Sequence, residues 1–285
     1  MRQVFLFVVI GVIMLIAGCM NLSPSSGKLT VYLTDAVLPL DQVQRIDVTI
    51  DKILLMSDTD DASVVVSDEA TTVNLLDLIG SEISFPTIQT SGTYTQLRLE
   101  ISQAKITVND QEYELRISSS SLKYPFTEPL QVNSDTVLVL DFDLSRSIKV
   151  TGSGGQGQGN QQGDKEYHMT PVIHLRHGDL YDITGSVKQD DTGVAHALVA
   201  LTKESTVVAT TFTHEYSEKW NEGDFRLSKI KPGEYVIKVF LKETYEGCEA
   251  DIENFILQWT PDATKTVNLG NQDLTDIVIN IGDNE

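Results

Sequence analysis

Basic residues are scarce in this chain of 285 residues, which has 21 lysines and arginines against 41 aspartates and glutamates and a net charge of −20. A surface this acidic repels phosphate backbones and anionic lipid headgroups. The composition therefore argues against nucleic-acid binding and against attachment to a membrane through surface charge. The excess of acid is typical of a surface that resists self-association.

Long hydrophobic runs are also missing, apart from Val4–Ile16, which is too short to cross a hydrocarbon core of about 30 Å. This run follows Arg2 and has the anatomy of a signal peptide. It leads into LIAGC, residues 15–19, which resembles the lipobox of prokaryotic lipoproteins. The resemblance implies that residues 1–18 are a lipoprotein signal peptide and that Cys19 receives the lipid. The alternative is an ordinary secretory signal with a chance cysteine.

Lipidation would fix both the location and the redox chemistry of the chain. Two or three acyl chains on Cys19 would anchor it essentially permanently, with residues 19–27 as a tether. Met20 is not the aspartate that retains many such lipoproteins at the inner membrane, so the resemblance implies the outer membrane or the cell surface. Cys248 would then have no partner for a disulfide, and the fold must depend on its hydrophobic core.

Helical periodicity is nearly absent, and only Thr71–Gly80 has a pattern that could form a short helical turn. Apolar residues instead alternate with polar ones, as at Leu97, Leu99 and Ile101, which predicts half-buried strands. We also read Ile252–Leu257 as a strand. The sequence predicts an all-β chain with two β-sandwich domains of Ig-like or transthyretin-like type in tandem.

Several strand details can be predicted as well. The apolar residues switch from even-numbered to odd-numbered positions after Ile50, so they change to the other face of the strand. This switch predicts a bulge or a strand end there. Asn109 and Asp110 can take the positive φ of a tight turn, so residues 105–115 form an expected hairpin. In residues 137–144, Asp141 and Asp143 share one face, and we expect them to face solvent rather than to form a catalytic pair.

The first part of the mature chain contains six segments with a shared resemblance: GKLTVYLTDA (27–36), VQRIDVTIDKI (43–53), VNLLDL (73–78), YTQLRLEI (94–101), LDFDLSRSI (140–148) and MTPVIHL (169–175). Together these segments resemble the prokaryotic lipoprotein family catalogued as domain of unknown function 4382. The resemblance implies a domain over residues 28–178 and brings no established activity. Residues 152–165 are rich in glycine and glutamine, and we expect a flexible loop there instead of a linker, because the flanking segments 147–150 and 167–175 could each complete a sheet.

The second part, residues 179–285, contains TGSVKQDDTGVAHALVALT (184–202) and GDFRLSKIKPGEYVIKVF (223–240), which resemble the carboxypeptidase regulatory-like and transthyretin-like β-sandwich modules. Gly193 permits a turn, Pro232 and Gly233 suit a tight turn between paired strands, and Tyr235 is expected to point inward. The connection at residues 212–223 is longer than the one usual in such modules. That connection is therefore an attractive place for a binding loop.

No motif for catalysis or metal binding is complete. The stretch Ser120–Lys123 has serine-x-x-lysine spacing but precedes Pro125 in a β context, where lysine cannot reach the serine oxygen. The other residue sets that could suggest a metal site, a calcium loop or a reactive thiol lack the required spacing or neighbours. These are His168, His174 and His177; Asp58, Asp60 and Asp61; and Cys248. We predict no catalytic residue, no metal, no cofactor and no enzymatic activity, with weak calcium binding by the acidic loop left open.

Aromatic residues make up only 7% of the chain, and both tryptophans lie in its second part. Sugar rings stack on exposed aromatic faces, so Trp220, Tyr216 and Trp259 are the candidate ligand contacts. Core packing is the competing interpretation for the tryptophans. The sequence therefore supports a non-enzymatic, lipid-anchored envelope protein for adhesion or scaffolding, or alternatively a carbohydrate-binding lipoprotein that uses its C-terminal sandwich. The expected partners are the membrane, through Cys19, and an envelope protein or polysaccharide.

Overall fold

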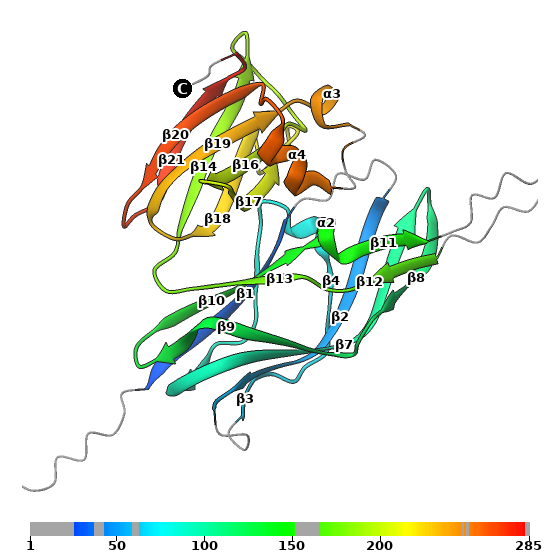
Figure 1. Ribbon diagram of the computed structural model, residues 1–285, viewed down its shortest axis with the longest axis vertical. Coiled ribbons are helices and arrows are strands. Elements are labelled where there is room, and N and C mark those ends of the chain that lie inside the picture. The colour runs from blue at the N-terminus through cyan, green and yellow to red at the C-terminus, as the bar shows by residue number, and fades with distance from the viewer. Residues whose placement is uncertain are drawn as a thin grey trace, which may run out of the picture.

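The computed structural model describes residues 26–36, 43–58, 63–151, 166–246, 248 and 251–282. It confirms the all-β prediction, because strands in several sheets make up most of the described chain (Figure 1). The predicted signal peptide with Cys19, the predicted loop at 152–165, and Asp60 and Asp61 lie outside the described residues. None of the helices in the described part is long and apolar enough to span a bilayer.

The first sandwich, residues 26–177, packs sheet A against the larger sheet B (Figure 1). Sheet A has the order β13-β10-β1-β5, with β6 also on β1; its strands are β1 (Gly27–Ala36), β5 (Ile83–Ser84), β6 (Ile88–Thr90), β10 (Thr136–Asp143) and β13 (Ile173–His177). Sheet B has the order β11-β12-β8-β7-β2-β3, with β4 on β2 and β9 on β7. Its strands are β2 (Val43–Met56), β3 (Ser63–Ser67), β4 (Thr71–Asn74), β7 (Gly92–Val108), β8 (Gln111–Ile117), β9 (Ser121–Val132), β11 (Ile148–Thr151) and β12 (Glu166–Met169).

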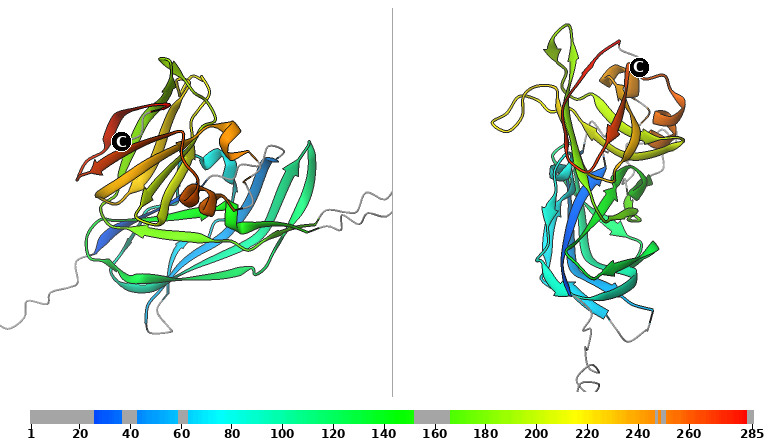
Figure 2. Two further views of the ribbon diagram at one scale, coloured as in Figure 1. Left: turned by 45° about the horizontal axis from the view of Figure 1, so that its top comes forward. Right: turned by 90° about the vertical axis from the view of Figure 1, so that its left-hand side faces the viewer.

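The second sandwich, residues 181–282, packs sheet C against sheet D (Figure 2). Sheet C has the order β15-β14-β18, with β21 also on β14; its strands are β14 (Tyr181–Gln189), β15 (Thr192–Gly193), β18 (Asp224–Ile230) and β21 (Leu274–Asn280). Sheet D has the order β17-β16-β19-β20; its strands are β16 (Leu198–Lys203), β17 (Thr206–Phe212), β19 (Gly233–Phe240) and β20 (Ala263–Leu269).

Each sandwich has its own hydrophobic core. The first core runs from Leu29 to Ile173 along the chain, and the second from Ile183 to Ile279. A third cluster lies on the outer face of sheet D, where α3 (Lys242–Tyr245) and α4 (Ile252–Gln258) pack on Leu198, Ala200 and Phe240. The assignment of residues 28–178 and 179–285 to separate domains stays a prediction.

Several sequence predictions about local structure are confirmed. Asn109 and Asp110 have φ of 50° and 61° at the β7–β8 turn. The ladder between β2 and β7 shifts register beside Ile50. The short turn within 71–80 is the 3₁₀ helix η1 (Leu75–Leu78). Segments 148–151 and 166–169 pair antiparallel as β11 and β12, as expected for strands that flank a loop.

Two predictions about strands are wrong. Ile252–Leu257 is helical in α4, because Ile252, Phe255 and Ile256 follow a helical period, and the Asp251 carboxylate caps the helix by accepting a hydrogen bond from Asn254 N. The segment 167–175 is two strands in different sheets, β12 and β13. Its break contains Pro171, which lacks the N–H that a continuous ladder needs.

Candidate functional site

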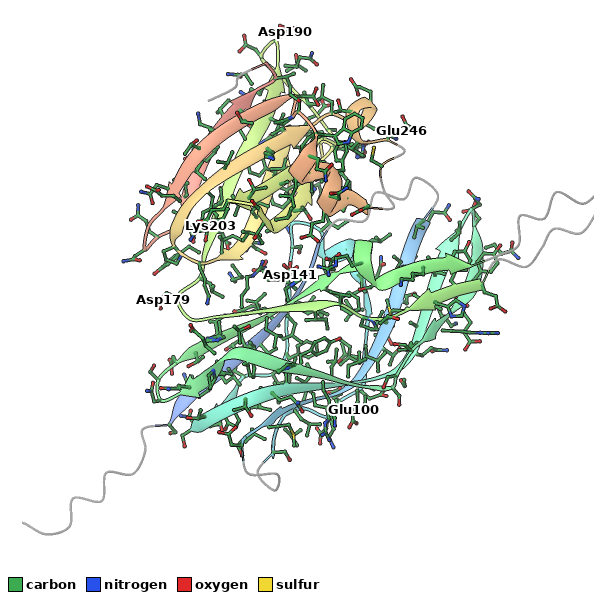
Figure 3. The ribbon with its side chains drawn as sticks, in the orientation of Figure 1. Glu100, Asp141, Asp179, Asp190, Lys203 and Glu246 are labelled. Atoms are coloured by element: carbon green, nitrogen blue, oxygen red, sulfur yellow. The ribbon has the colours of Figure 1, made fainter. Side chains whose placement is uncertain are left out.

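Strand β10 is buried on both faces, which places two carboxylates at the junction of the sandwiches. Phe142 belongs to the first core, whereas Asp141 and Asp143 lie on the opposite face of sheet A and are only 5% and 9% exposed. Figure 3 labels Asp141 between the two sandwiches. The prediction that these aspartates face solvent is wrong, because the second sandwich covers this face of the sheet.

Asp141 takes part in an ion pair that also reaches the second sandwich. Its Oδ2 accepts a hydrogen bond from Arg176 Nη1 at 2.8 Å, and both side chains are largely buried, with exposures of 7% and 12%. The same guanidinium nitrogen donates to the carbonyl of Val208 in β17 at 3.3 Å. Arg176 therefore neutralises the carboxylate within its own sheet and holds the backbone of the neighbouring sandwich.

Asp143 organises the adjoining part of the junction. Its carboxylate caps α2 (Leu144–Ser147) by accepting a hydrogen bond from Arg146 N at 3.1 Å. Its Oδ2 lies 3.6 Å from His174 Nε2, and this carboxylate raises the pKa of His174 although partial burial of the ring lowers it. Arg146 in turn pairs with Glu253 of α4 at 3.3 Å, across a cavity of about 290 Å³ between the sandwiches.

A second cluster of charges joins sheet C to the loop after η1. Arg226 Nη2 lies 2.6 Å from Asp182 Oδ2 and 2.8 Å from Glu82 Oε1, and these side chains are 15–20% exposed. Burial by itself raises the pKa of Asp182. The hydrogen bonds from Lys229 N and Arg226 outweigh this effect of burial and leave the pKa below its usual value. The carboxylate therefore stays charged, which an ion pair that crosses the junction requires.

A β-bulge in β18 aims a lysine at the same place. Tyr181 pairs with Ile230 and Ile183 with Leu227, so β18 has one extra residue there. Lys229 takes a left-handed φ of 56°, and its ammonium lies 3.5 Å from Glu82 Oε1 and 5.4 Å from the ring centroid of Tyr32 in β1. Bulges commonly redirect a side chain in this way, and here the redirected group contacts the first sandwich.

The loop between β17 and β18 presents Trp220 in an ordered turn. Two backbone hydrogen bonds close the base of this loop, one from His214 N to the carbonyl of Asp224 and one from Gly223 N to the carbonyl of His214. Ser217 Oγ accepts bonds from the backbone of Lys219 and Trp220. The indole stacks on His214 with ring centroids 4.2 Å apart and an interplanar angle of 10°. The loop protrudes from the second sandwich in the right-hand view of Figure 2.

Trp220 lines an open groove of about 440 Å³ on the outer face of sheet C. The polar side chains in this groove come from β14, β18, β21 and the loop; they are Thr184, Ser186, Lys219, Asn221, Asp224 and Asp276. Exposed Val278 adds an apolar patch. The groove thus combines an indole with hydroxyl, amide, ammonium and carboxylate groups. Trp220 could be identified from the sequence, whereas the strand residues could not, because their shared face depends on the order of strands in sheet C.

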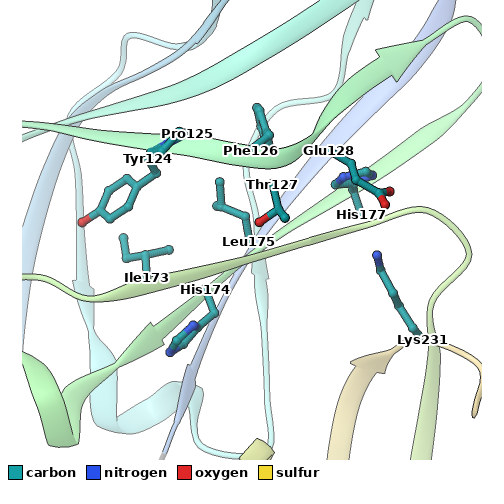
Figure 4. Close-up of a pocket in the computed structure, with 10 residues that line it drawn as sticks. All are labelled: Tyr124, Pro125, Phe126, Thr127, Glu128, Ile173, His174, Leu175, His177 and Lys231. Atoms are coloured by element: carbon teal, nitrogen blue, oxygen red, sulfur yellow. The ribbon is translucent and has the colours of Figure 1, made fainter. Parts of the chain in front are cut away.

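A cavity of about 510 Å³ lies between β9 and β13 (Figure 4). Tyr124 of β9 and Ile173 and Leu175 of β13 line it from two sides, and Lys231 enters from the second sandwich. Tyr124 Oη donates to the carbonyl of Pro171 at 2.9 Å. Since its lining mixes apolar side chains with a hydroxyl, a carboxylate, two histidines and an ammonium, this cavity shows no preference for one kind of ligand.

The structure does not bring the three predicted aromatic contacts onto one surface. Trp220 lines the groove on sheet C, whereas Trp259 follows α4 on the side of sheet D. The ring centroids of Trp259 and Phe255 are 5.4 Å apart. Tyr216 is 78% exposed and Trp259 is 56% exposed. Cys248 is partly buried against the cluster under α3 and α4. The role of these residues in ligand binding stays a prediction.

The three histidines considered for a metal site are separate in the structure. His168 lies in β12 beside Glu166, His174 lies beside Asp143, and His177 contacts Phe126 edge-on at 6.0 Å between ring centroids. Burial, reinforced by the charge of Lys231, lowers the pKa of His177. Within the described residues, no three side chains of histidine, cysteine or acid are grouped so that they could hold a metal ion.

Comparison with known proteins gives one family match. The profile of the family described as "Domain of unknown function (DUF4382)" matches residues 26–168, half of the chain. No curated protein matches the sequence.

The solved structures with detectable similarity are distant. A double mutant of the shaft pilin SpaA from Lactobacillus rhamnosus GG is 9% identical, with 90% of this chain and 98% of that chain covered and a TM-score of 0.24. BcpA, the major pilin subunit of Bacillus cereus, is 10% identical, with coverage of 90% and 100% and a TM-score of 0.24. The TIE protein of Bacillus anthracis is 9% identical, with coverage of 93% and 41% and a TM-score of 0.23. TM-scores this low do not establish a common architecture.

Proposed function

The chain belongs to the DUF4382 family, and from this premise we propose that it is a non-enzymatic, lipid-anchored protein of the cell envelope whose two sandwiches act together as one scaffolding or adhesive unit. The family brings no activity of its own. The proposal therefore depends on the lipobox-like LIAGC sequence for the anchor and on the junction for the mechanical unit.

The observation that carries the proposal is the covered outer face of sheet A. An isolated sandwich would expose the face that holds Asp141 and Arg176, yet these side chains are 7% and 12% exposed because the second sandwich lies on them. Charged groups also connect the sandwiches at Glu82 with Arg226 and at Arg146 with Glu253. Two sandwiches held at several separated points transmit force and resist hinge motion better than two sandwiches on a free linker.

The lipid anchor is tested by expressing the full chain in a bacterial host fed with an alkyne-tagged fatty acid. We expect the tag on the wild-type protein, which partitions into the detergent phase, and no tag on the Cys19→Ala variant. A Cys248→Ala variant is the matched control and should be labelled like the wild type. Equal labelling of the Cys19→Ala variant, or a wild-type protein without label, contradicts the anchor.

The scaffolding role is tested by cross-linking in intact cells followed by mass spectrometry. We expect reproducible cross-links between this chain and envelope proteins that are lost when the anchor is removed by Cys19→Ala. Cross-links that are unchanged in the unanchored variant, or that are random in partner, speak against a fixed place in an envelope assembly.

The second candidate function, capture of polysaccharide by the C-terminal sandwich, is favoured by one observation. The groove on sheet C brings Trp220 together with hydroxyl, amide and carboxylate groups on an open surface. An adhesive envelope protein could use such a groove to hold a glycan. This second function is independent of the lipid anchor and can be tested separately.

A further inference from the structure

We propose that the groove on the outer face of sheet C binds a neutral polysaccharide chain, with the indole of Trp220 as its stacking surface and the strand side chains as its hydrogen-bonding floor. This inference rests on the second candidate function above and specifies its site, its ligand class and the residues that recognise the ligand. It does not depend on the anchor or on scaffolding.

The floor of the groove is the part of sheet C that the first sandwich leaves open. In β14, Ile183 and Val187 point into the second core, so Thr184 and Ser186 lie on the opposite face. The same face of sheet C also holds Arg226, directly opposite Thr184, and Arg226 pairs with Glu82 at the junction. One face of this sheet thus serves two purposes: one end contacts the first sandwich, and the other end is the groove.

The floor provides hydrogen-bonding groups that the protein itself does not use. The backbone of β14 is paired with β18 on one side and with β21 on the other. Within the part of the chain that the structure describes, the Thr184 and Ser186 hydroxyls form no hydrogen bond with the protein. A hydroxyl both donates and accepts, as each sugar hydroxyl does, so such a floor suits a ligand covered with hydroxyl groups.

A second β-bulge adds a carboxylate to the floor. Ile183 pairs with Leu274 but Gly185 pairs with Ile277, so β21 has one extra residue, and Asp276 takes a left-handed φ of 60°. Gly185 permits this geometry, because a Cβ at that position would lie 2.2 Å from the carbonyl oxygen of Ile277. Aspartate is one of the few non-glycine residues that adopt this conformation readily. The bulge brings the Asp276 side chain to the groove.

The indole is held in place before any ligand binds. His214 stacks on Trp220, and Gly80 of the first sandwich lies next to the edge of the His214 ring, since a Cβ on Gly80 would be only 3.1 Å from His214 Nε2. Lys219 Nζ lies over the indole, 5.2 Å from its centroid, so a sugar that stacks on this ring displaces the ammonium, which can then donate to a sugar hydroxyl. A fixed aromatic surface loses little conformational entropy on binding, which favours affinity.

Charge selects the class of glycan. The groove contains Asp224 and Asp276 against the single ammonium of Lys219, and the whole chain has a net charge of −20. An anionic polysaccharide would be repelled by both the groove and the surrounding surface, whereas a neutral one would not. The polar groups and the indole also fit a glycan better than an extended apolar peptide, which would offer the Thr184 and Ser186 hydroxyls no hydrogen-bond partner.

The test is calorimetric titration of the full chain in detergent micelles with three soluble probes: mixed-linkage β-glucan, glucomannan and anionic polygalacturonate. We expect saturable binding of a neutral probe and at least tenfold weaker binding of polygalacturonate. Trp220→Ala should weaken the binding of the neutral probe at least tenfold. Trp259→Ala, the matched control on the side of sheet D, should leave that binding unchanged.

Since Trp220→Ala could disturb the loop, two variants of the floor make the test independent of it. Thr184→Val and Asp276→Asn should each weaken the binding of the neutral probe at least threefold, and the far-ultraviolet circular dichroism spectrum should stay unchanged. Equal effects of Trp220→Ala and Trp259→Ala, preference for the anionic probe, or no binding of any probe would overturn the proposal. Saturable binding that none of the groove variants alters would keep polysaccharide capture as a function and refute this site.

Discussion

The buried ion pair between Asp141 and Arg176 gives the sharpest prediction about the junction. Replacing the carboxylate by Asp141→Asn keeps the shape of the side chain and removes its charge, which leaves the guanidinium of Arg176 buried without a counterion. Breaking a fully buried pair costs about 3–5 kcal/mol. Arg176 keeps its bond to the carbonyl of Val208, and the new amide can still accept a hydrogen bond. We therefore expect a loss of about 2–3 kcal/mol in the free energy of unfolding.

The matched control is Glu166→Gln, which breaks the exposed pair with Arg116, where the two side chains are 50% and 61% exposed. We expect this change to cost below about 0.5 kcal/mol, because exposed pairs are screened by water and salt. Urea denaturation followed by circular dichroism gives both free energies, and hydrogen exchange of β10 and β17 shows where protection is lost. Equal losses in the two variants would refute the claim that the second sandwich buries the Asp141 pair.

Three further predictions concern the core, the junction loop and pH. Phe142→Ala should cost about 3–5 kcal/mol in urea denaturation, because Phe142 is fully buried in the first core, and a loss under about 1 kcal/mol would contradict that packing. Gly80→Ala should cost about 1–2 kcal/mol, since Gly80 has φ of 64° and a Cβ would press on His214. The pKa of His174 is raised in the folded protein, so protonated His174 stabilises the fold. This stabilisation should be complete at a pH below the ordinary histidine pKa of 6.5 and should be lost as the pH rises through the raised pKa. The stability difference between the wild type and His174→Asn should therefore be larger at pH 5.5 than at pH 9, and a difference that grows with pH would refute the assignment.

The strands, turns and bulge near Ile50 could be predicted because they depend on neighbouring residues, through alternation of side chains and the φ preferences of asparagine and aspartate. The junction could not, because Asp141 and Asp143 have the same two-residue period whether water or another sandwich covers their face. One signal was available: the uninterrupted apolar run from Val137 to Leu140 is typical of a strand buried on both faces. Helix α4 was missed although its residues follow a helical period, because seven residues of helix are short enough to be mistaken for a strand.

The groove, like the junction, could be predicted only in part from the sequence. Trp220 stood out in the sequence because it lies in a long polar connection, whereas Thr184, Ser186 and Asp276 became neighbours only through the parallel pairing of β14 with β21. That pairing joins segments almost a hundred residues apart. Local patterns do not encode such a contact, and the two bulges that aim Lys229 and Asp276 depend on the same long-range registers.

The distribution of charge leads to a last prediction about the junction. Acids outnumber bases in both halves of the chain, so two separate sandwiches would repel each other. The junction offsets this repulsion by pairing Arg226 with Glu82 and Arg146 with Glu253 across the two sandwiches, and by the hydrogen bond from Arg176 to the carbonyl of Val208. Salt screens the exposed surface far more than partly buried pairs, and the Debye length falls to about 3 Å at 1 M.

High salt should therefore remove the repulsion between the sandwiches and leave most of the attraction, so the two sandwiches should stay docked. Small-angle X-ray scattering of the full chain in detergent-free solution, made with Cys19→Ala, should give the same radius of gyration at 0.1 M and 1 M sodium chloride. The double variant Asp141→Asn with Glu82→Gln should expand at the low salt concentration, where repulsion is strongest. A wild-type chain that expands at 1 M would mean that exposed ion pairs, and not the buried ones, hold the sandwiches together.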